Sequence, residues 1–360
     1  MKVSYFIFVT LAAIRHHVVD MLGLLTDVRG RAISLPQLSN VLTSLDGQRK
    51  EVTGVEVASE LMQPGSHSGI LRLSLAGGAA PRSVFLKRIT ATHVPMADRP
   101  WPDRRRTLAY ARTEARFYQE FAADGAMEAR LMRLGVRLPR LAMSENSMDT
   151  LLGDAAVHEA AGEEPSAELQ AGAGAMLFME CGEGYTQASP LSETQAKVAL
   201  RAVAGLHAAG WEDEPMLRRA SERLQRHGGV YALEIRSPAE LTKLQPNWDA
   251  FCGAFGDLEP ELFERPGVAG LGERLARWTA YASERVSPGP ADRYATLVHG
   301  DFKAMNVLLP LDGGSTAAGG AAAGGLVAGG AAPMLIVSMV SVVRIVGIVR
   351  MVRMGRMGGM

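Results

Sequence analysis

A short polar segment, His299 to Asn306, lies between two apolar runs and restricts the folds open to this chain. It follows Leu297-Val298 directly and precedes Val307-Leu308-Leu309. Short apolar runs on both sides of a polar break predict two strands joined by a loop. Because its pattern is His-x-Asp-x-Lys-x-x-Asn, this loop would carry a carboxylate, an ammonium group and an amide at fixed spacing.

Each polar side chain of this segment suits a task in phosphoryl transfer. Asp301 can orient an acceptor hydroxyl and receive its proton. Asn306 can ligate Mg²⁺ through its amide oxygen without adding charge, and Lys303 can neutralise the transferring phosphoryl group. His299 is interpreted as structural, bracing the loop by hydrogen bonds. The alternative interpretation is a plain polar turn between two strands.

An extended region from Glu51 to Ile89 comes earlier in the chain and predicts three strands. Lys87 lies in the last of them, and a lysine among apolar strand residues needs an anionic partner. We expect Glu114, on a helix predicted over residues 107–123, to hold its ammonium group beside the phosphates of ATP. The alternative is an ordinary charge on an edge strand.

The turn predicted between the first two strands, Pro64 to Gly69, is rich in glycine and serine. Its backbone N–H groups are candidates for contacts with nucleotide phosphates. These candidate residues are Gly65, Ser66, Ser68 and Gly69. Turns of this composition also occur without any ligand, so the order of turn, lysine, glutamate and aspartate loop carries more weight than the turn itself.

Composition divides the chain into five segments: a leader at 1–34, an N-lobe at 35–175 with a mobile loop at 144–175, a helical C-lobe at 176–310, a Gly/Ala linker at 311–333, and a low-complexity Arg/Met tail at 334–360. Ser192 and Gln195 are spaced as a capping box and predict a helix start in the C-lobe. The apolar stretch at 1–14 is either a leading helix or a signal sequence. The tail is either read-through sequence without an evolved function or a basic helix on a membrane surface.

Bulk composition favours a small-molecule partner. Thirty-eight basic residues balance 38 acidic ones, which gives no indication of nucleic-acid binding, and Arg105-Arg106 is interpreted as a solvated helix start. Cys181 and Cys252 cannot form a disulfide framework. No apolar run reaches the ~20 residues that a membrane span needs. We therefore expect no nucleic acid, no membrane span and a cytoplasmic location; the oligomeric state stays open.

These residues together resemble the aminoglycoside phosphotransferase and choline kinase superfamily, in particular its choline-kinase-like branch, which includes ecdysteroid-kinase-like proteins. The resemblance extends from about Leu35 to Leu309. It rests on four segments, of which the last is the most specific: Glu114 to Tyr118, Leu177 to Glu180, Leu206 to Trp211, and His299 to Asn306. Gly300 is typical of this superfamily, whereas protein kinases carry an arginine there.

The resemblance implies an α+β, protein-kinase-like, two-lobed fold, with a small N-lobe of five strands and a helical C-lobe that is truncated here. ATP would lie between the lobes, and the hinge near Glu180 and Cys181 would meet the adenine. Mg²⁺ would bind at Asn306. The implied activity is ATP-dependent phosphotransfer to a hydroxyl of a small-molecule alcohol, with Asp301 and Lys303 as catalytic residues.

The chain departs from this family after Asn306. Relatives place a second acidic metal ligand in a later Ile-Asp-Phe-like strand, because two metal ions bridge the phosphates. Here Asp312 is the only acidic residue after Asn306, and Met334 to Val337 leads into Ser338. The C-terminal helices of relatives are also missing, which predicts exposed apolar surface. The alternative function is therefore a nucleotide-binding pseudokinase, or an incomplete gene product without catalysis.

Overall fold

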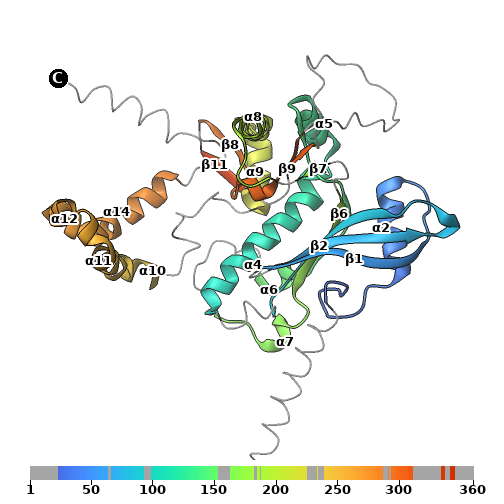
Figure 1. The fold of residues 1–360 in the computed structure, drawn as a ribbon, viewed down its shortest axis with the longest axis horizontal. Helices are drawn as coiled ribbons and strands as arrows, with labels where there is room; N and C mark the ends of the chain where they lie inside the picture. Colours follow the sequence, from blue (N-terminus) through green and yellow to red (C-terminus); the bar gives the residue numbers. More distant parts are fainter. Residues whose placement is uncertain are drawn as a thin grey trace, which may run out of the picture.

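The computed structural model describes residues 23–63, 66–92, 99–152, 163–181, 185–186, 188–224, 233, 239–286, 291, 293–310, 334–336 and 341–344. These residues form an α+β protein (Figure 1). An antiparallel five-stranded sheet in the order β1-β2-β3-β6-β5 lies on one side of helix α4, and helices α8 and α9 lie on the other. The expected α+β class and the small sheet are thus confirmed.

The five strands are β1 (Val52–Gln63), β2 (Ser66–Leu75), β3 (Arg82–Thr90), β5 (Leu141–Asn146) and β6 (Gly174–Glu180). The first three form a meander, as predicted for the extended region before Ile89. A one-turn helix, η1 (Ala76–Gly78), connects β2 to β3. Along β2, Leu71 and Leu73 are fully buried while Arg72 between them is exposed, so period-two alternation decides which face is covered.

Helix α2 (Leu35–Asp46) covers one face of this sheet. Ser34 accepts a hydrogen bond from the Gln37 backbone and completes a capping box, and Gly47 ends the helix in the left-handed region at φ 68°. The core between α2 and the sheet also contains residues from the segment expected as a leader: Leu24, Val28 and Ile33. The packed unit therefore includes residues that precede α2.

The other face of the sheet is covered by α4 (Trp101–Arg116), which continues as a π-helical segment, η2 (Phe117–Ala122), into α5 (Gly125–Arg133). This helix begins six residues before the predicted range of 107–123. Arg105 was expected in a solvated helix start, but it is only 4% exposed. That interpretation was wrong because the start of α4 packs against the α7 region, where Arg104 donates to Gln170 at 2.8 Å.

The connection between β5 and β6 contains two short helices, α6 (Met148–Leu152) and α7 (Ala167–Gln170). This is most of the segment expected as a loop at 144–175. Residues 153–162 lie outside the described residues. Met148, Leu151 and Leu152 are buried, so the first of these helices belongs to the core.

The second core joins α4 and α5 to α8 (Glu193–Ala209), α9 (Glu214–Arg223) and β8 (Ala295–Val298). The capping box predicted for α8 is confirmed, because Ser192 and Gln195 exchange both side-chain to backbone hydrogen bonds. A helix at η6 (Ala304–Asn306) and strand β9 (Val307–Pro310) follow β8. The predicted strand, loop and strand around the polar segment are thus present.

Two strands lie within the segment expected as a tail. β10 (Met334–Ile336) pairs antiparallel with β9 and parallel with β4 (Val136–Arg137). The second strand of this segment, β11 (Ser341–Arg344), pairs antiparallel with β8. The other edge of β9 pairs with β7 (Tyr185–Thr186), which lies earlier in the chain. The predicted linker at 311–333 lies outside the described residues.

A helical unit lies apart from the sheet at the left of Figure 1. Its elements are α10 (Ala239–Thr242), α11 (Leu244–Phe255), η5 (Gly256–Leu258), α12 (Pro260–Phe263), α13 (Pro266–Ala269) and α14 (Leu271–Val286). Leu258 of this unit is 75% exposed and Trp278 is 62% exposed. Among the described residues, no helix has the length and apolar content that a membrane crossing requires.

Candidate functional site

The ion pair expected between Lys87 and Glu114 is present. Lys87 projects from β3 and Glu114 from α4, and Nζ lies 2.6 Å from Oε2. The Glu114 side chain is 2% exposed and that of Lys87 is 20% exposed. In the sheet, Lys87 lies between Ser68 on β2 and Leu177 on β6. The ammonium group is thus held by the helix while part of its surface stays open.

The Glu114 carboxylate has capacity for a further partner. Its Oε1 atom is buried and makes no hydrogen bond to any described residue. A buried carboxylate with one oxygen unsatisfied is costly, which makes the single contact with Lys87 important for the stability of this carboxylate. The ion pair therefore connects the sheet to α4 and leaves part of the Lys87 side chain accessible to solvent.

The glycine and serine residues expected in a turn lie elsewhere. Gly65 is outside the described residues, and Ser66, Ser68 and Gly69 belong to β2. The predicted turn at 64–69 was therefore too long, because β2 pairs with β1 from Ser66 onward. Within β2, the backbone groups of Ser68 and Gly69 serve the ladders to both neighbouring strands rather than a phosphate.

Gly69 has a packing role. A Cβ atom at this position would meet the Ser59 backbone oxygen at 2.2 Å and Leu24 Cδ2 at 2.5 Å. A Cβ atom does not fit within those distances. Glycine at this position therefore allows β1 and the side chain of Leu24 to approach β2 closely. The sequence interpretation assigned this glycine to phosphate binding and missed the packing reason.

Three polar residues of the 299–306 segment, Asp301, Lys303 and Asn306, meet in one cluster. Asn306 Nδ2 donates to the backbone oxygen of Asp301 at 2.7 Å and to its Oδ2 atom at 3.0 Å. Lys303 Nζ lies 2.9 Å from the same Oδ2 atom. The Asp301 side chain is 46% exposed, so its carboxylate is open to an incoming molecule. The other amide atom of Asn306, Oδ1, has no hydrogen bond among the described residues and can act as a ligand.

His299 and Gly300 shape the loop. His299 is 1% exposed, its Nδ1 accepts from the Asp301 backbone at 3.3 Å, and its ring meets Phe302 edge to face at 5.6 Å. Gly300 adopts φ 74°, where residues with a Cβ are strained. The structural role expected for His299 agrees with these contacts.

Glu180 and Cys181 lie at the end of β6. The Glu180 carboxylate pairs with Arg137 at 2.6 Å and Arg140 at 3.3 Å, and its backbone N–H donates to the Arg140 oxygen at 2.8 Å. Cys181 is half-buried and free of disulfides. Sequence reasoning missed both arginines, whose only signal was their position just before a strand that pairs with β6.

A second group that the sequence did not reveal lies on α4. Arg112 and Arg116, each about 1% exposed, lie one turn apart, and Arg116 pairs with Asp149 of α6 at 2.8 Å. Arg116 also donates to the Arg223 backbone oxygen at 3.0 Å, which ties α4 to the end of α9. The i, i+4 spacing of the arginines was visible in the sequence, but their burial depended on α6 and α9.

The structure thus forms two separate clusters. Lys87 pairs with Glu114, and Asp301 pairs with Lys303 and Asn306, but no hydrogen bond or ion pair among the described residues joins these clusters. Within the same residues, no group of three or more His, Cys, Asp or Glu side chains could hold a metal ion. Asp312 lies outside the described residues.

Comparison with known proteins adds no family to this description. No family model matches the chain, and searches of curated proteins and solved structures return no significant match.

Proposed function

We propose that this chain has a protein-kinase-like fold and transfers a phosphoryl group from ATP to a hydroxyl of a small-molecule alcohol. The observation that carries the proposal is the 2.6 Å contact between Lys87 and Glu114. These residues, 27 positions apart, were selected from the sequence for a phosphate-binding role, and they meet between a five-stranded sheet and its covering helix. A strand lysine held by a helix glutamate is the arrangement that positions ATP phosphates in kinases.

The Asp301 cluster supports the transfer step. The acceptor hydroxyl would give its proton to the Asp301 carboxylate while its oxygen forms a bond to the γ-phosphorus. The bond from that phosphorus to the bridging oxygen breaks, and ADP leaves with the bonding electrons. Lys303, already 2.9 Å from the carboxylate, would offset the charge of the transferring group. The exposed Asp301 side chain leaves room for the acceptor.

The residues present fit one Mg²⁺ ion. Asn306 Oδ1 is an oxygen ligand of the type that Mg²⁺ accepts alongside waters and phosphates. Bound there, the ion would neutralise phosphate charge. A two-metal arrangement needs a further acidic ligand, and β10 and β11, which flank the cluster through β9 and β8, contain none.

That missing acid favours a second candidate function, a pseudokinase that binds a nucleotide without transferring phosphate. Removal of a metal-binding carboxylate withdraws several kcal/mol of charge stabilisation from the transition state, enough for a loss of several orders of magnitude in rate. Nucleotide binding would rest on Lys87 and Glu114, which are distinct from the missing ligand.

A thermal-shift titration with ATP and Mg²⁺ tests the proposal, because a ligand that binds only the native state stabilises it by about 2.7 kcal/mol at 100 times its Kd. We expect the shift in the parent chain and in Asp301→Ala, and its loss in Lys87→Met. Lys197→Met, which removes an exposed lysine from α8, is the matched control. Absence of a shift in the folded parent chain contradicts both candidate functions. A shift without ATP-dependent phosphorylation of any alcohol in a screen favours the pseudokinase.

A further inference from the structure

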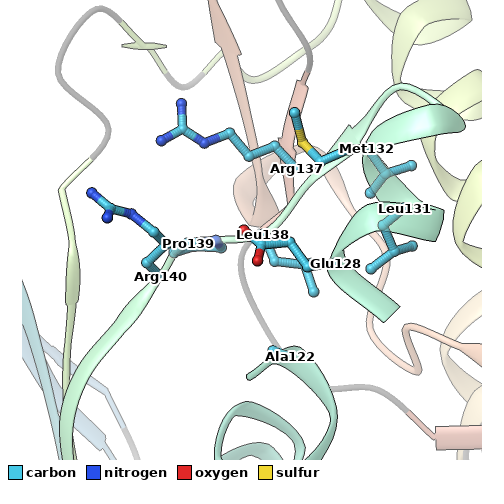
Figure 2. Close-up of a pocket in the computed structure, with 9 residues that line it drawn as sticks. Ala122, Glu128, Leu131, Met132, Arg137, Leu138, Pro139 and Arg140 are labelled. Atoms are coloured by element: carbon cyan, nitrogen blue, oxygen red, sulfur yellow. The ribbon is translucent and has the colours of Figure 1, made fainter. Parts of the chain in front are cut away.

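The helical unit formed by α10 to α14 exposes large apolar side chains to solvent. The cavity of about 250 Å³ beside α5 (Figure 2) differs, because Leu131 and Val136 in its wall are 1% and 0% exposed. None of the described residues of the helical unit belongs to either hydrophobic core. Exposed apolar surface of this kind is typical of an interaction site. Among the described residues of the unit, seven are 44–75% exposed: Phe251, Phe255, Leu258, Leu262, Leu275, Trp278 and Tyr281.

Helix α14 turns its larger apolar side chains away from the helix beside it. It packs along α11, and a Cβ atom added at Gly272 would meet Gln245 Cα at 2.5 Å. Gly272 and Ser283 are buried and lie three turns apart, so they share the face that packs inward. Leu275 is 51% exposed and Trp278 is 62% exposed, and both lie outside that face. Because an amphipathic helix normally buries its large apolar residues, the exposed face of α14 is suited to another protein surface.

Two exposed arginines border this face of α14. Arg274 lies one turn before Trp278, and Arg277 lies one turn before Tyr281. Within the described part of the chain, Arg277 makes no ion pair or hydrogen bond, and Arg274 donates to a backbone oxygen of α13. Glu273, five residues before Trp278, lies on a different side of the helix. The exposed face of α14 is therefore aromatic and positively charged.

Acidic side chains gather beyond the last residue of α11. Asp257 and Glu259 flank Leu258, which is 75% exposed, and Glu261 follows two residues later. All three carboxylates are exposed, and none has an ion pair among the residues that the structure describes. This end of the unit is therefore apolar and negatively charged.

The acidic and basic groups lie at opposite ends of the unit. Helices α11 and α14 start side by side, because the Glu273 backbone N–H donates to Gln245 Oε1 at 2.7 Å. Asp257 follows α11, a helix of 12 residues that is about 18 Å long. Arg274 and Asp257 are thus about one helix length apart, too far for an ion pair within one copy. A two-fold rotation interchanges the ends, so a second copy places its acidic end against the arginines and its arginines against the acidic end.

We propose that α10 to α14 form the interface of a two-fold symmetric dimer of this chain. Arg274 and Arg277 of each copy lie against the acidic end of the other, and Trp278 is covered by apolar side chains of the second copy. A membrane surface is disfavoured, because anionic lipids would attract the arginines and repel the acidic end. None of the residues proposed for phosphotransfer lies in these helices, so the two proposals stand or fall separately.

Sedimentation velocity of the full chain between about 1 and 100 µM tests the proposal, because self-association follows mass action. We expect the mass to shift from one chain to two as the concentration rises. No larger species should form, since a two-fold interface closes with two copies. A parent chain that stays monomeric throughout, or one that forms larger assemblies, would overturn the proposal.

Trp278→Ala tests the apolar contact. It should raise the dimer Kd roughly 30-fold, the effect of truncating an aromatic anchor in an interface. Leu200→Ala, which changes a side chain of the same 62% exposure on α8, should leave the Kd unchanged. Both positions are exposed, so neither substitution disturbs a core, and circular dichroism checks the fold. An unchanged Kd in Trp278→Ala would contradict the proposed interface.

Charge reversal identifies the partner as a second copy. Arg274→Glu/Arg277→Glu and Asp257→Arg/Glu259→Arg should each raise the Kd at least about tenfold, because each places like charges together at both ends of the dimer. An equimolar mixture of the two variants should form heterodimers about as tight as the parent dimer, since every reversed end then meets its complement. Arg201→Glu, at an exposed position of α8, is the control and should have no effect.

The mixture separates this arrangement from apolar association without charge pairing. If Arg274→Glu/Arg277→Glu fails to fold, Arg277→Glu replaces it, because Arg277 makes no contact with another charged side chain in the described residues. Reversed variants that dimerise as tightly as the parent, or folded variants that stay monomeric when mixed, would each refute the pairing of opposite ends.

Discussion

Asn306 donates two hydrogen bonds to Asp301, one to the backbone oxygen at 2.7 Å and one to the carboxylate at 3.0 Å. The residue proposed as a metal ligand therefore also holds the proposed base in position. Both bonds span five residues, so they close the loop that leads from β8 to β9.

Replacement of this amide should weaken the loop. Asn306→Ala removes both hydrogen bonds and should lower the free energy of unfolding by about 1–3 kcal/mol in urea denaturation. The same variant should reduce the part of the ATP thermal shift that depends on Mg²⁺. Asn247→Ala, in α11 of the separate helical unit, serves as the control. Equal losses in the two variants would argue against a bracing role for Asn306.

The two members of the Lys87–Glu114 pair should differ in their effect on stability. Lys87→Met leaves a carboxylate that is 2% exposed without its cation, and should cost about 3–5 kcal/mol. Glu114→Gln leaves a lysine that is 20% exposed and can turn toward solvent, so it should cost less.

The double variant Lys87→Met/Glu114→Gln removes both charges and should be more stable than Lys87→Met alone. Chemical denaturation of the four proteins completes the cycle. Strictly additive effects would show that the two charges do not interact in solution.

Gly69→Ala should destabilise the sheet. The added Cβ would lie 2.2 Å from the Ser59 backbone oxygen, and a backbone atom cannot move aside without shifting β1. We expect a loss of about 1–3 kcal/mol in the free energy of unfolding. Gly253→Ala in α11 is the control, because a Cβ added there would meet no atom within 4 Å and alanine favours a helix interior. A Gly69→Ala protein as stable as its parent would refute the close packing.

Acid should destabilise the fold through His207. Burial at the end of α8 lowers the pKa of this imidazole below its ordinary 6.5. The unfolded chain therefore binds a proton at His207 more readily than the folded chain does. As a result, the contribution of neutral His207 to the free energy of unfolding is complete above pH 6.5 and is lost as the pH falls toward the lowered pKa of the folded state. Thermal melts between about pH 5 and 8 should show a shallower dependence in His207→Gln. Identical pH profiles for the parent and the variant would show that His207 does not cause the pH dependence of stability.

Local sequence patterns were sufficient for the elements whose boundaries depend on neighbouring residues. The three strands before Ile89, the capping box of α8 and the strands on both sides of residues 299–306 follow from periodicity and capping chemistry. The Lys87–Glu114 contact was also expected: a lysine among apolar strand residues needs an anionic partner, and Glu114 was selected by analogy with the strand lysine and helix glutamate of protein kinases.

Tertiary contacts decided the rest of the fold. Pairing with β1 starts β2 at Ser66, so Ser66, Ser68 and Gly69 belong to the strand and not to the expected turn. Packing near α7 buries Arg105 in a helix that begins at Trp101. Tertiary packing also decided the role of Gly69, since Leu24 approaches it from outside the sheet. These features depend on residues far apart in the chain, and a local pattern contains no information about which distant surface will meet it.

The sequence by itself determined the kinds of groups available for chemistry: a strand lysine, a helix glutamate, and an aspartate, a lysine and an amide in one loop. Their spacing fixed which groups share an element. Only the tertiary structure decided that Glu180 is engaged by Arg137 and Arg140 while Glu114 is buried with Lys87 as its ion-pair partner. The charge of a side chain is set by its chemistry, but whether that charge is neutralised or left for a ligand depends on which other residues the fold brings within reach.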